Sequence, residues 1–251
     1  MISLKNISHI FDNGIEKNHA LKSINLDVPE GQFVTVIGGN GAGKSTLLNI
    51  IDGNLHPTSG SILIDGKDVE RKSHSARAAL IARVFQDPNT GVSPELTIAE
   101  NMALANSRGR WSLFRWAIHK RDIAFFRERL AEFGLGLEDM LHKKASLLSG
   151  GQRQVVALLM ATMQKPELLL LDEHTAALDP RIAKQVMGIT KKLVEDQNIT
   201  TLMVSHNMSD AIAYGERLLM LDRGEITLDV SGEEKQALTP AELIMKFELE
   251  D

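Results

Sequence analysis

Apolar positions along this chain predict a series of strands separated by helices. Short runs of β-type residues dominate the first part of the chain and lie at 2–7, 20–28, 33–37, 61–65 and 80–85. A helical stretch at 44–51 interrupts them. Later runs are almost continuously apolar, as expected for strands buried on both faces, and lie at 168–171, 201–204 and 218–221. Strands that alternate with helices predict an α/β fold with a largely parallel, covered sheet.

The strand pattern stops in the middle of the chain, and helical spacing replaces it. Apolar side chains then recur at i, i+3, i+7 and i+10, on one face of an amphipathic helix, at Ile123, Phe126, Leu130 and Phe133. We therefore predict an α/β core at 1–86 and 161–251, with a helical subdomain inserted at 87–160. A short polar link at 231–239 precedes a final helix at 241–250.

Composition narrows the class of protein. The chain has 251 residues, 43% hydrophobic and 24% charged, which is ordinary for a soluble globular protein. A net charge of -5 argues against a nucleic-acid partner, and the lack of cysteine excludes disulfides and thiolate metal sites. The amino terminus has no signal pattern, and no apolar run approaches the roughly 20 residues that span a bilayer. These features predict a soluble, cytoplasmic protein.

A phosphate-binding loop follows the strand at 33–37. The P-loop pattern is complete and is followed by a helix; its residues are Gly38, Gly39, Asn40, Gly41, Ala42, Gly43, Lys44 and Ser45, with Thr46 next. Glycines let backbone N–H groups wrap the β-phosphate, Lys44 supplies charge to the β and γ oxygens, and Ser45 can ligate Mg²⁺. The alternative is a glycine-rich turn. The full pattern between a strand and a helix favours binding of a nucleoside triphosphate.

Two adjacent acids, Asp172 and Glu173, follow the apolar run at 168–171. They lie at the carboxyl end of a predicted buried strand, where open α/β sheets bind their ligands. Strand ends also carry acids that are merely solvated, but a P-loop in the same chain favours a catalytic interpretation. We expect Asp172 to hold Mg²⁺ through its water, and Glu173 to polarise the water that attacks the γ-phosphate.

A second anion-binding surface is predicted at the start of another helix. Leu148 is followed by Ser149, Gly150, Gly151 and Gln152. Together they offer a hydroxyl, unhindered backbone N–H groups and the positive end of a helix dipole.

With these three motifs in this order, the chain resembles the ATP-binding subunits of ABC transporters over nearly its whole length. The resemblance implies a P-loop NTPase fold, with a RecA-like core, an antiparallel β subdomain and an inserted α-helical subdomain. It also implies roles for four further residues. Gln86 is the glutamine that senses Mg²⁺ and the γ-phosphate, Asp179 belongs to the loop that crosses to a partner subunit, His206 is the switch histidine, and Phe11 stacks on the base. Phe33 is a poorer rival for this last role.

The resemblance further implies how the two phosphate surfaces combine. Ser149 and Gly151 would close over the ATP of a second copy arranged head to tail, so that two ATP molecules hold a homodimer together. Hydrolysis would reopen the dimer and drive integral membrane permease subunits, at the cytoplasmic face of the membrane. ATP and Mg²⁺ are the implied cofactors, and a substrate-binding protein is an expected member of the complex.

Two departures from the family pattern stand out. Gly39 and His174 occupy positions where family members often carry proline. His174 is open to two interpretations, a tuning role on Glu173 or a neutral variation.

The sequence around His174 resembles importers whose permeases are similar to those for branched-chain amino acids, which points to import of a small solute such as an amino acid. A lipoprotein-release or lipid-export complex is the alternative, and a non-transport ABC ATPase is less favoured.

The segment at 108–129 is basic and aromatic. It holds seven basic residues and two acidic ones, a net charge of +5, and five aromatic residues including Trp111 and Trp116. Such a segment is typical of a permease dock or a membrane-surface element. A helical hairpin with packed aromatic side chains and solvated arginines is the alternative.

Overall fold

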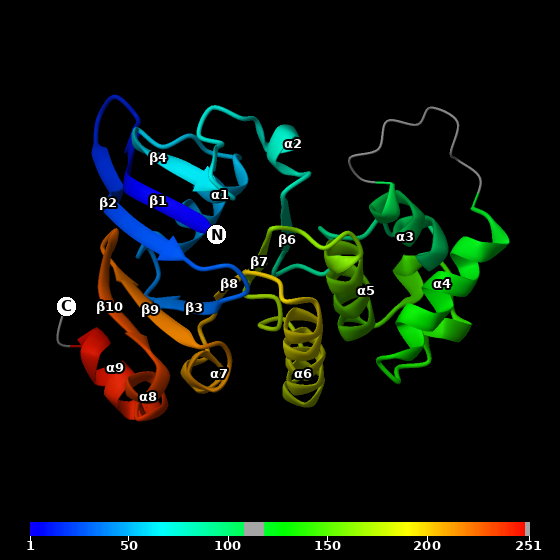
Figure 1. Ribbon diagram of the computed structural model, residues 1–251. Coiled ribbons are helices and arrows are strands. Elements are labelled where there is room, and N and C mark those ends of the chain that lie inside the picture. Colours follow the sequence, from blue (N-terminus) through cyan, green and yellow to red (C-terminus); the bar gives the residue numbers. More distant parts are fainter. Residues whose placement is uncertain (108–117, 249–251) are drawn as a thin grey trace. The chain divides into compact units, whose positions relative to one another are not determined.

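The computed structural model describes residues 1–107 and 118–248, which fall into two compact units (Figure 1). The first unit comprises Met1–Arg83, Glu167–Glu173 and Gln197–Asp251. The second unit comprises Val84–Pro166 and His174–Asp196. The domain limits expected from the sequence stay a prediction.

An antiparallel sheet forms one layer of the first unit. Its order is β2-β1-β4-β5, with β1 at Ile2–Asp12, β2 at Lys17–Val28, β4 at Ser59–Ile64 and β5 at Lys67–Asp68. Strand β1 is longer than the predicted run at 2–7, because its pairing with β2 shifts register three times and continues past these residues. Such bulges interrupt the period-2 alternation from which a strand is recognised.

The second sheet of the chain is mostly parallel and has the order β10-β9-β3-β8-β7-β6. Its strands are β3 (Phe33–Gly38), β6 (Ile81–Val84), β7 (Leu168–Asp172), β8 (Thr201–Val204), β9 (Arg217–Asp222) and β10 (Glu225–Ser231). Strands β8 and β9 both pair with β3 in parallel, and β10 pairs with β9 as an antiparallel edge. The four leucines of β7 before Asp172 are all buried, as their continuous apolar run predicts.

Side-chain alternation along β3 and β9 divides the first unit's core in two. Val34 and Val36 belong to a cluster that also contains residues of the antiparallel sheet and of α1 (Lys44–Asp52). Ile37 belongs instead to a cluster with α7 (Met208–Ala213) and α9 (Pro240–Glu248). The parallel sheet therefore packs on both faces, which accounts for its apolar strands.

Two short helices complete the first unit. They are α2 (His74–Arg77) and α8 (Gly232–Gln236). The sequence predicted a polar link where α8 lies, because five residues are too few to display helical periodicity. The helix expected at 241–250 is confirmed as α9 over its described residues.

The second unit is helical apart from the end of β6. Its α-helices are α3 (Ile98–Asn106), α4 (Lys120–Ala131), α5 (Gly150–Thr162) and α6 (Pro180–Gln197) (Figure 1). Two 3₁₀ turns, η1 (Leu137–Asp139) and η2 (Ala145–Leu147), lead into α5. Phe126 and Leu130 of α4 are fully buried, which confirms the predicted apolar face, whereas Phe133 lies beyond the end of that helix. Within residues 1–107 and 118–248, no helix combines the length and apolar character needed to cross a bilayer.

Candidate nucleotide-binding site

The loop between β3 and α1 has the backbone geometry of a phosphate cradle. Gly41 and Gly43 have φ angles of 81° and 106°, in the left-handed region that favours glycine. A Cβ at Gly43 would lie 2.5 Å from the carbonyl oxygen of Ala20, so that position also excludes larger residues sterically. A Cβ at Gly39 or Gly41 would meet nothing within 4 Å, so these two positions border open space. The helix that starts at Lys44 adds the positive end of its dipole.

Lys44 lies inside this loop and is 6% exposed. Its ammonium donates hydrogen bonds to the carbonyl oxygens of Gly38 and Gly39, at 2.7 and 2.9 Å. Burial lowers the pKa of Lys44, and the nearby charges of Glu173 and Asp172 counteract that shift. An ammonium has three N–H donors, so one remains available for an anion.

Glu173 follows β7 in an unusual backbone conformation, with a φ angle of 48°. Its N–H donates to the carbonyl oxygen of Val204 at 3.1 Å, which ties it to the end of β8. A non-glycine residue in this region costs about 1–3 kcal/mol and persists only where its surroundings hold it, commonly at functional sites.

The predicted switch histidine contacts the predicted catalytic carboxylate. His206 Nε2 lies 2.5 Å from Glu173 Oε1, and the carboxylate side chain is only 12% exposed. Two residues chosen independently from the sequence are thus brought together at adjacent strand ends, β7 and β8, as the edge of a parallel sheet predicts.

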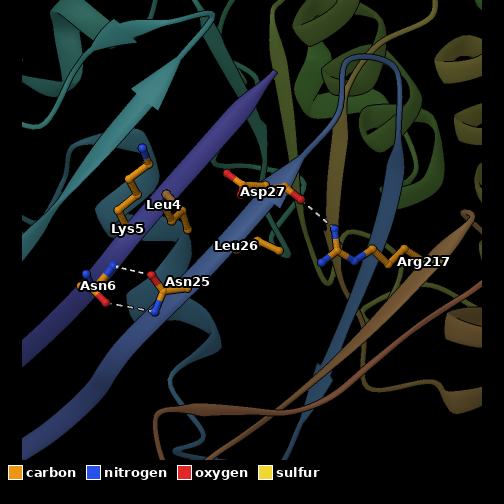
Figure 2. A pocket seen from close by; sticks show the side chains of 7 residues that line it. All are labelled: Leu4, Lys5, Asn6, Asn25, Leu26, Asp27 and Arg217. Carbon is orange, nitrogen blue, oxygen red and sulfur yellow. Dashed lines mark hydrogen bonds between the residues drawn. The ribbon is translucent and has the colours of Figure 1, made fainter.

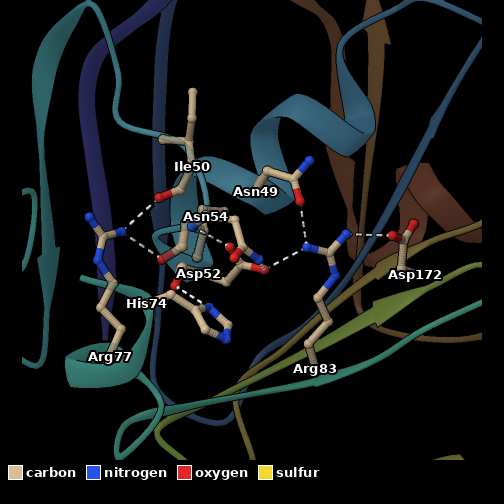
Figure 3. A network of polar contacts seen from close by, with 9 residues as sticks. Asn49, Ile50, Asp52, Asn54, His74, Arg77, Arg83 and Asp172 are labelled. Carbon is tan, nitrogen blue, oxygen red and sulfur yellow. Dashed lines mark hydrogen bonds and ion pairs between the residues drawn. The ribbon is translucent and has the colours of Figure 1, made fainter. Parts of the chain in front are cut away.

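An arginine that the sequence analysis did not select also contacts this edge (Figure 3). Arg83 of β6 donates from Nη2 to Oδ2 of Asp172 at 2.6 Å. From Nη1 it donates to Oδ2 of Asp52 at 2.5 Å and to Oδ1 of Asn49 at 2.7 Å. A single basic residue inside the apolar run at 80–85 was the only sequence signal for this contact.

Phe11 lies near the end of β1, and its side chain is 45% exposed. Its ring meets the ring of His9 edge to face, with centroids 4.5 Å apart. The rival Phe33 is 3% exposed and belongs to the core, so only Phe11 has a face available for stacking.

The donor set fits a nucleotide-bound Mg²⁺ better than a resident ion. Among the described residues, no group of three or more His, Cys, Asp or Glu side chains is arranged to hold a metal. Mg²⁺ commonly binds through one or two carboxylates, waters and the phosphates of its nucleotide. Ser45, which is exposed, and Asp172 carry the oxygen atoms that the sequence predicts as Mg²⁺ ligands, and this role stays a prediction.

The second anion surface is formed at the start of α5. Ser149 is the N-cap: its Oγ accepts the N–H of Gln152 at 3.3 Å, and Gln152 Oε1 accepts the N–H of Ser149 at 3.0 Å. A Cβ at Gly151 would lie 2.2 Å from Cγ2 of Ile182, so α6 requires glycine there. This capping box fixes the helix start whose N–H groups and dipole suit an anion.

The remaining predicted site residues also belong to the second unit. Gln86 lies two residues after β6, and the carbonyl of its neighbour Phe85 accepts a hydrogen bond from Gln154 of α5 at 3.2 Å. Asp179 is exposed, and its Oδ1 accepts the N–H of Arg181 at 3.0 Å, at the start of α6.

His174 is fully enclosed in the second unit. Its Nε2 lies 3.0 Å from the hydroxyl of Thr190, which itself donates to the carbonyl of Val186. Burial lowers the pKa of His174 to about 4, so the ring is neutral at pH 7. The hydrogen-bond partner of His174 is therefore Thr190 on α6, and the contact between them is structural.

The first part of the basic, aromatic segment lies outside the described residues. Positions 108–117, which include Trp111, Phe114 and Trp116, are not described, so both interpretations of the segment stay open. In its described part, Phe126 is buried and packs against Phe125, with ring centroids 5.9 Å apart.

A separate groove in the first unit carries no comparable chemistry (Figure 2). Asn6 and Asn25 bond to each other there, and Arg217 donates to the carbonyl of Asp27 at 2.7 Å. These polar groups thus bond to one another.

Comparison with known proteins decides the family. Residues 21–176 match the ABC transporter family. A tyrosine transport ATP-binding protein of Clostridioides difficile is 44% identical over 251 residues, which cover 99% of both chains. The chain belongs to the ABC transporter family. A methionine import ATP-binding protein of Mannheimia succiniciproducens is 34% identical, over 98% of this chain and 70% of that one.

Solved ABC cassettes share the fold. A dimeric cassette in a post-hydrolysis state, bound to ADP and phosphate, has a TM-score of 0.75 and 33% identity, and covers 92% of this chain and 98% of its own. Another cassette in its ADP conformation has a TM-score of 0.81 and 26% identity, over 100% of this chain and 99% of its own. The expected P-loop NTPase fold is confirmed. This ABC transporter subunit binds and hydrolyses ATP as part of an import system, and the export alternative is not favoured.

Proposed function

We propose that this subunit powers the import of an amino acid, with an aromatic amino acid such as tyrosine as the first cargo to test. The observation that carries the proposal is the 44% identity, over 99% of both chains, to a tyrosine transport ATP-binding protein. The ATPase works beside membrane permease subunits, and we further place a substrate-binding protein in the complex and the ATPase on the cytoplasmic side. A permease similar to branched-chain amino acid permeases stays a prediction.

At the nucleotide site, the P-loop N–H groups and Lys44 hold the phosphates while Phe11 stacks on the base. Ser45 and Asp172 would hold Mg²⁺, and Gln86 is the residue predicted to sense it. When bound, the ion would supply positive charge against the β- and γ-phosphates. The exposed face of Phe11 and the limited oxygen ligand set support these assignments.

Glu173 orients and polarises the attacking water, and His206 donates a hydrogen bond to the γ-phosphate. The 2.5 Å contact between their side chains supports a coupled role. When His206 turns to the phosphate, the Glu173 carboxylate is left to accept a hydrogen bond from water. Hydrolysis thus depends on a nucleotide that draws the histidine away from its partner.

Closure uses a second copy. Ser149, Gly150, Gly151 and Gln152 of one copy cover the γ-phosphate of ATP held by the other, and Asp179 lies at the crossing loop. Dimeric solved cassettes at 33–34% identity support this arrangement. A 1:99 to 99:1 shift toward the closed pair requires about 5.5 kcal/mol, which a few charge-assisted hydrogen bonds of roughly 1.5 to 3 kcal/mol each can supply.

Transport by the reconstituted complex tests the cargo. The ATPase is to be purified with its permease and binding protein, reconstituted in liposomes, and supplied with radiolabelled tyrosine, methionine or leucine. We expect ATP-dependent uptake that tyrosine saturates and excess unlabelled tyrosine abolishes. ATP hydrolysis without uptake of any amino acid would refute the cargo while leaving the ATPase assignment intact.

A further inference from the structure

The ion-pair chain Asp52–Arg83–Asp172 is the one cluster of buried charges at the nucleotide site to which the proposed mechanism assigns no task (Figure 3). The Arg83 side chain is 8% exposed, the Asp52 side chain 2% and the Asp172 side chain 17%. All three residues belong to the first unit. Burying charges is costly unless they are paired and hydrogen-bonded, so a buried chain that ends on a metal-binding carboxylate calls for a function.

Asp52 is the fixed end of this chain. It is the last residue of α1, and its carboxylate accepts two hydrogen bonds from Asn54, from the main-chain N–H and from Nδ2, both at 2.9 Å. These bonds hold the carboxylate in place at the end of the helix that begins at the P-loop. Its negative charge is matched by Nη1 of Arg83 at 2.5 Å.

Arg83 connects the fixed carboxylate of Asp52 to the carboxylate of Asp172. A guanidinium is planar and rigid, so the partners of Nη1 determine where Nη2 points. Asp52 and Asn49 accept hydrogen bonds from Nη1, and Nη2 donates to Oδ2 of Asp172 at 2.6 Å. The carboxylate is thereby oriented, and its second oxygen can serve the metal or a metal-bound water.

A neighbouring buried arginine provides a matched comparison. Arg77 is fully buried beside the same helix, but its hydrogen bonds go to main-chain carbonyls, including those of Ile50 and Ile51 at 2.6 and 2.8 Å. Arg77 therefore fastens the backbone at the end of α1, whereas Arg83 joins two carboxylates. The two arginines share burial and differ in their connection to Asp172.

We propose that Arg83 tunes the negative charge that Asp172 offers to a divalent cation, with Asp52 as the counter-charge of Arg83, and that this pair sets the affinity of the ATP site for its divalent cation. The inference rests on the proposed role of Asp172. The positive charge of Arg83 competes with the metal for the Asp172 carboxylate, and Asp52 draws part of that charge away. Removing the charge of Asp52 therefore weakens metal binding, and removing the charge of Arg83 strengthens it.

The test is a Mn²⁺ titration of full-length protein kept in molar excess over ATP, so that unbound nucleotide does not chelate the metal, followed by the loss of the free Mn²⁺ electron paramagnetic resonance signal. Asp52→Asn should raise the half-saturating Mn²⁺ concentration roughly tenfold, and Arg83→Gln should lower it by a similar factor, within the range typical of residues behind metal ligands. Arg83→Lys, which keeps the charge, should lie between Arg83→Gln and the unaltered protein. The control Arg77→Gln should lower the melting temperature and leave half-saturation unchanged.

Opposite shifts separate this role from a merely structural one. The proposal is overturned if Asp52→Asn and Arg83→Gln shift the half-saturating concentration in the same direction or leave it unchanged, or if Arg77→Gln reproduces the Arg83→Gln shift. Asp52→Asn is nearly isosteric and carries a signed expectation by itself, so the test survives if an Arg83 variant fails to fold. Failure of the unaltered protein to bind Mn²⁺ with ATP would instead refute the proposed nucleotide site.

Discussion

The two proposed phosphate-binding surfaces of this chain are built on opposite principles. The edge of the parallel sheet in the first unit concentrates charge: Lys44 within its loop, Asp172 paired with Arg83, and Glu173 against His206. The start of α5 in the second unit presents no charged side chain in its first three residues and relies on a capping box. One surface is equipped for chemistry, and the other only for recognising an anion.

This difference explains why neither surface is sufficient alone. The carboxylate that polarises the attacking water is proposed to lie on one side of the γ-phosphate, so the phosphate also has to be bound from the opposite side. Neutral N–H groups can bind it there without adding a competing acid or base. Variants that abolish the chemistry should therefore leave recognition intact, and variants that abolish recognition should leave nucleotide binding intact.

The largest expected effect is on turnover. Glu173→Gln removes the carboxylate that polarises water, and we expect ATP hydrolysis to fall by roughly 10²–10⁴-fold, the usual contribution of a general base. ATP binding should persist, so the variant should form a dimer that requires ATP. Size-exclusion chromatography with light scattering checks this, with EDTA and ADP as controls. A monomer at saturating ATP would contradict the composite site.

Ser149→Arg should abolish anion recognition at the start of α5 and leave the charged edge of the parallel sheet intact. The bulk of arginine at the N-cap of α5 and the loss of the capping hydroxyl obstruct the anion surface but leave the first unit unchanged. We expect binding of a fluorescent ATP analogue to stay within about twofold, while ATP-dependent dimerisation and turnover are lost. Ser149→Thr, which keeps a capping hydroxyl, is the matched control and should dimerise. Loss of nucleotide affinity in Ser149→Arg monomers would mean that the helix contacts its own copy's ATP.

A third prediction concerns the packing that shapes the α5 surface. Gly151→Ala would place a Cβ 2.2 Å from Cγ2 of Ile182, and such overpacking costs about 1–3 kcal/mol. Urea denaturation should show this loss for the single variant. Gly151→Ala combined with Ile182→Ala should recover most of it, relative to Ile182→Ala alone. An equal loss in both backgrounds would show that α6 does not set the glycine requirement.

A final prediction, of similar size, concerns the buried histidine. Thr190→Val removes the hydroxyl that faces Nε2 of His174 and leaves a buried polar group unsatisfied, at a cost of about 1–3 kcal/mol. Thr190→Ser keeps the hydroxyl and should lose much less. Denaturant unfolding at pH 7 measures both, and equal losses would show that the hydrogen bond contributes nothing. ATPase activity of folded Thr190→Val should be near normal, which would favour the neutral interpretation of His174.

The contiguous parts of the site were predictable from the sequence. The P-loop, Asp172, Glu173 and the start of α5 each depend on residues that are neighbours along the chain, so their local geometry follows from the motif. The buried leucines of β7 were predictable for the same reason.

The charge network was not predictable, because it depends on long-range register. Arg83 reaches Asp52 across 31 positions and Asp172 across 89. The neighbouring places of β6 and β7 in the sheet bring Arg83 to Asp172, whereas Asp52 comes from α1. The positive φ of Glu173 was also inaccessible, since nothing in its residue type requires it. Sequence motifs therefore indicate where the nucleotide binds, whereas the pairing of strands in the sheet determines which side chains contact the carboxylate of Asp172.

Mixed-variant dimerisation tests the central claim most directly, the claim that each ATP is held by the first unit of one copy and covered by α5 of the other. Lys44→Ala and Ser149→Arg, both in the Glu173→Gln background, should each stay monomeric with ATP. Mixed together, they should form an ATP-dependent heterodimer, because one of its two sites combines an intact P-loop with an intact α5. A mixture that stays as monomeric as its components would contradict the account, since that result is expected if each α5 serves the nucleotide of its own copy.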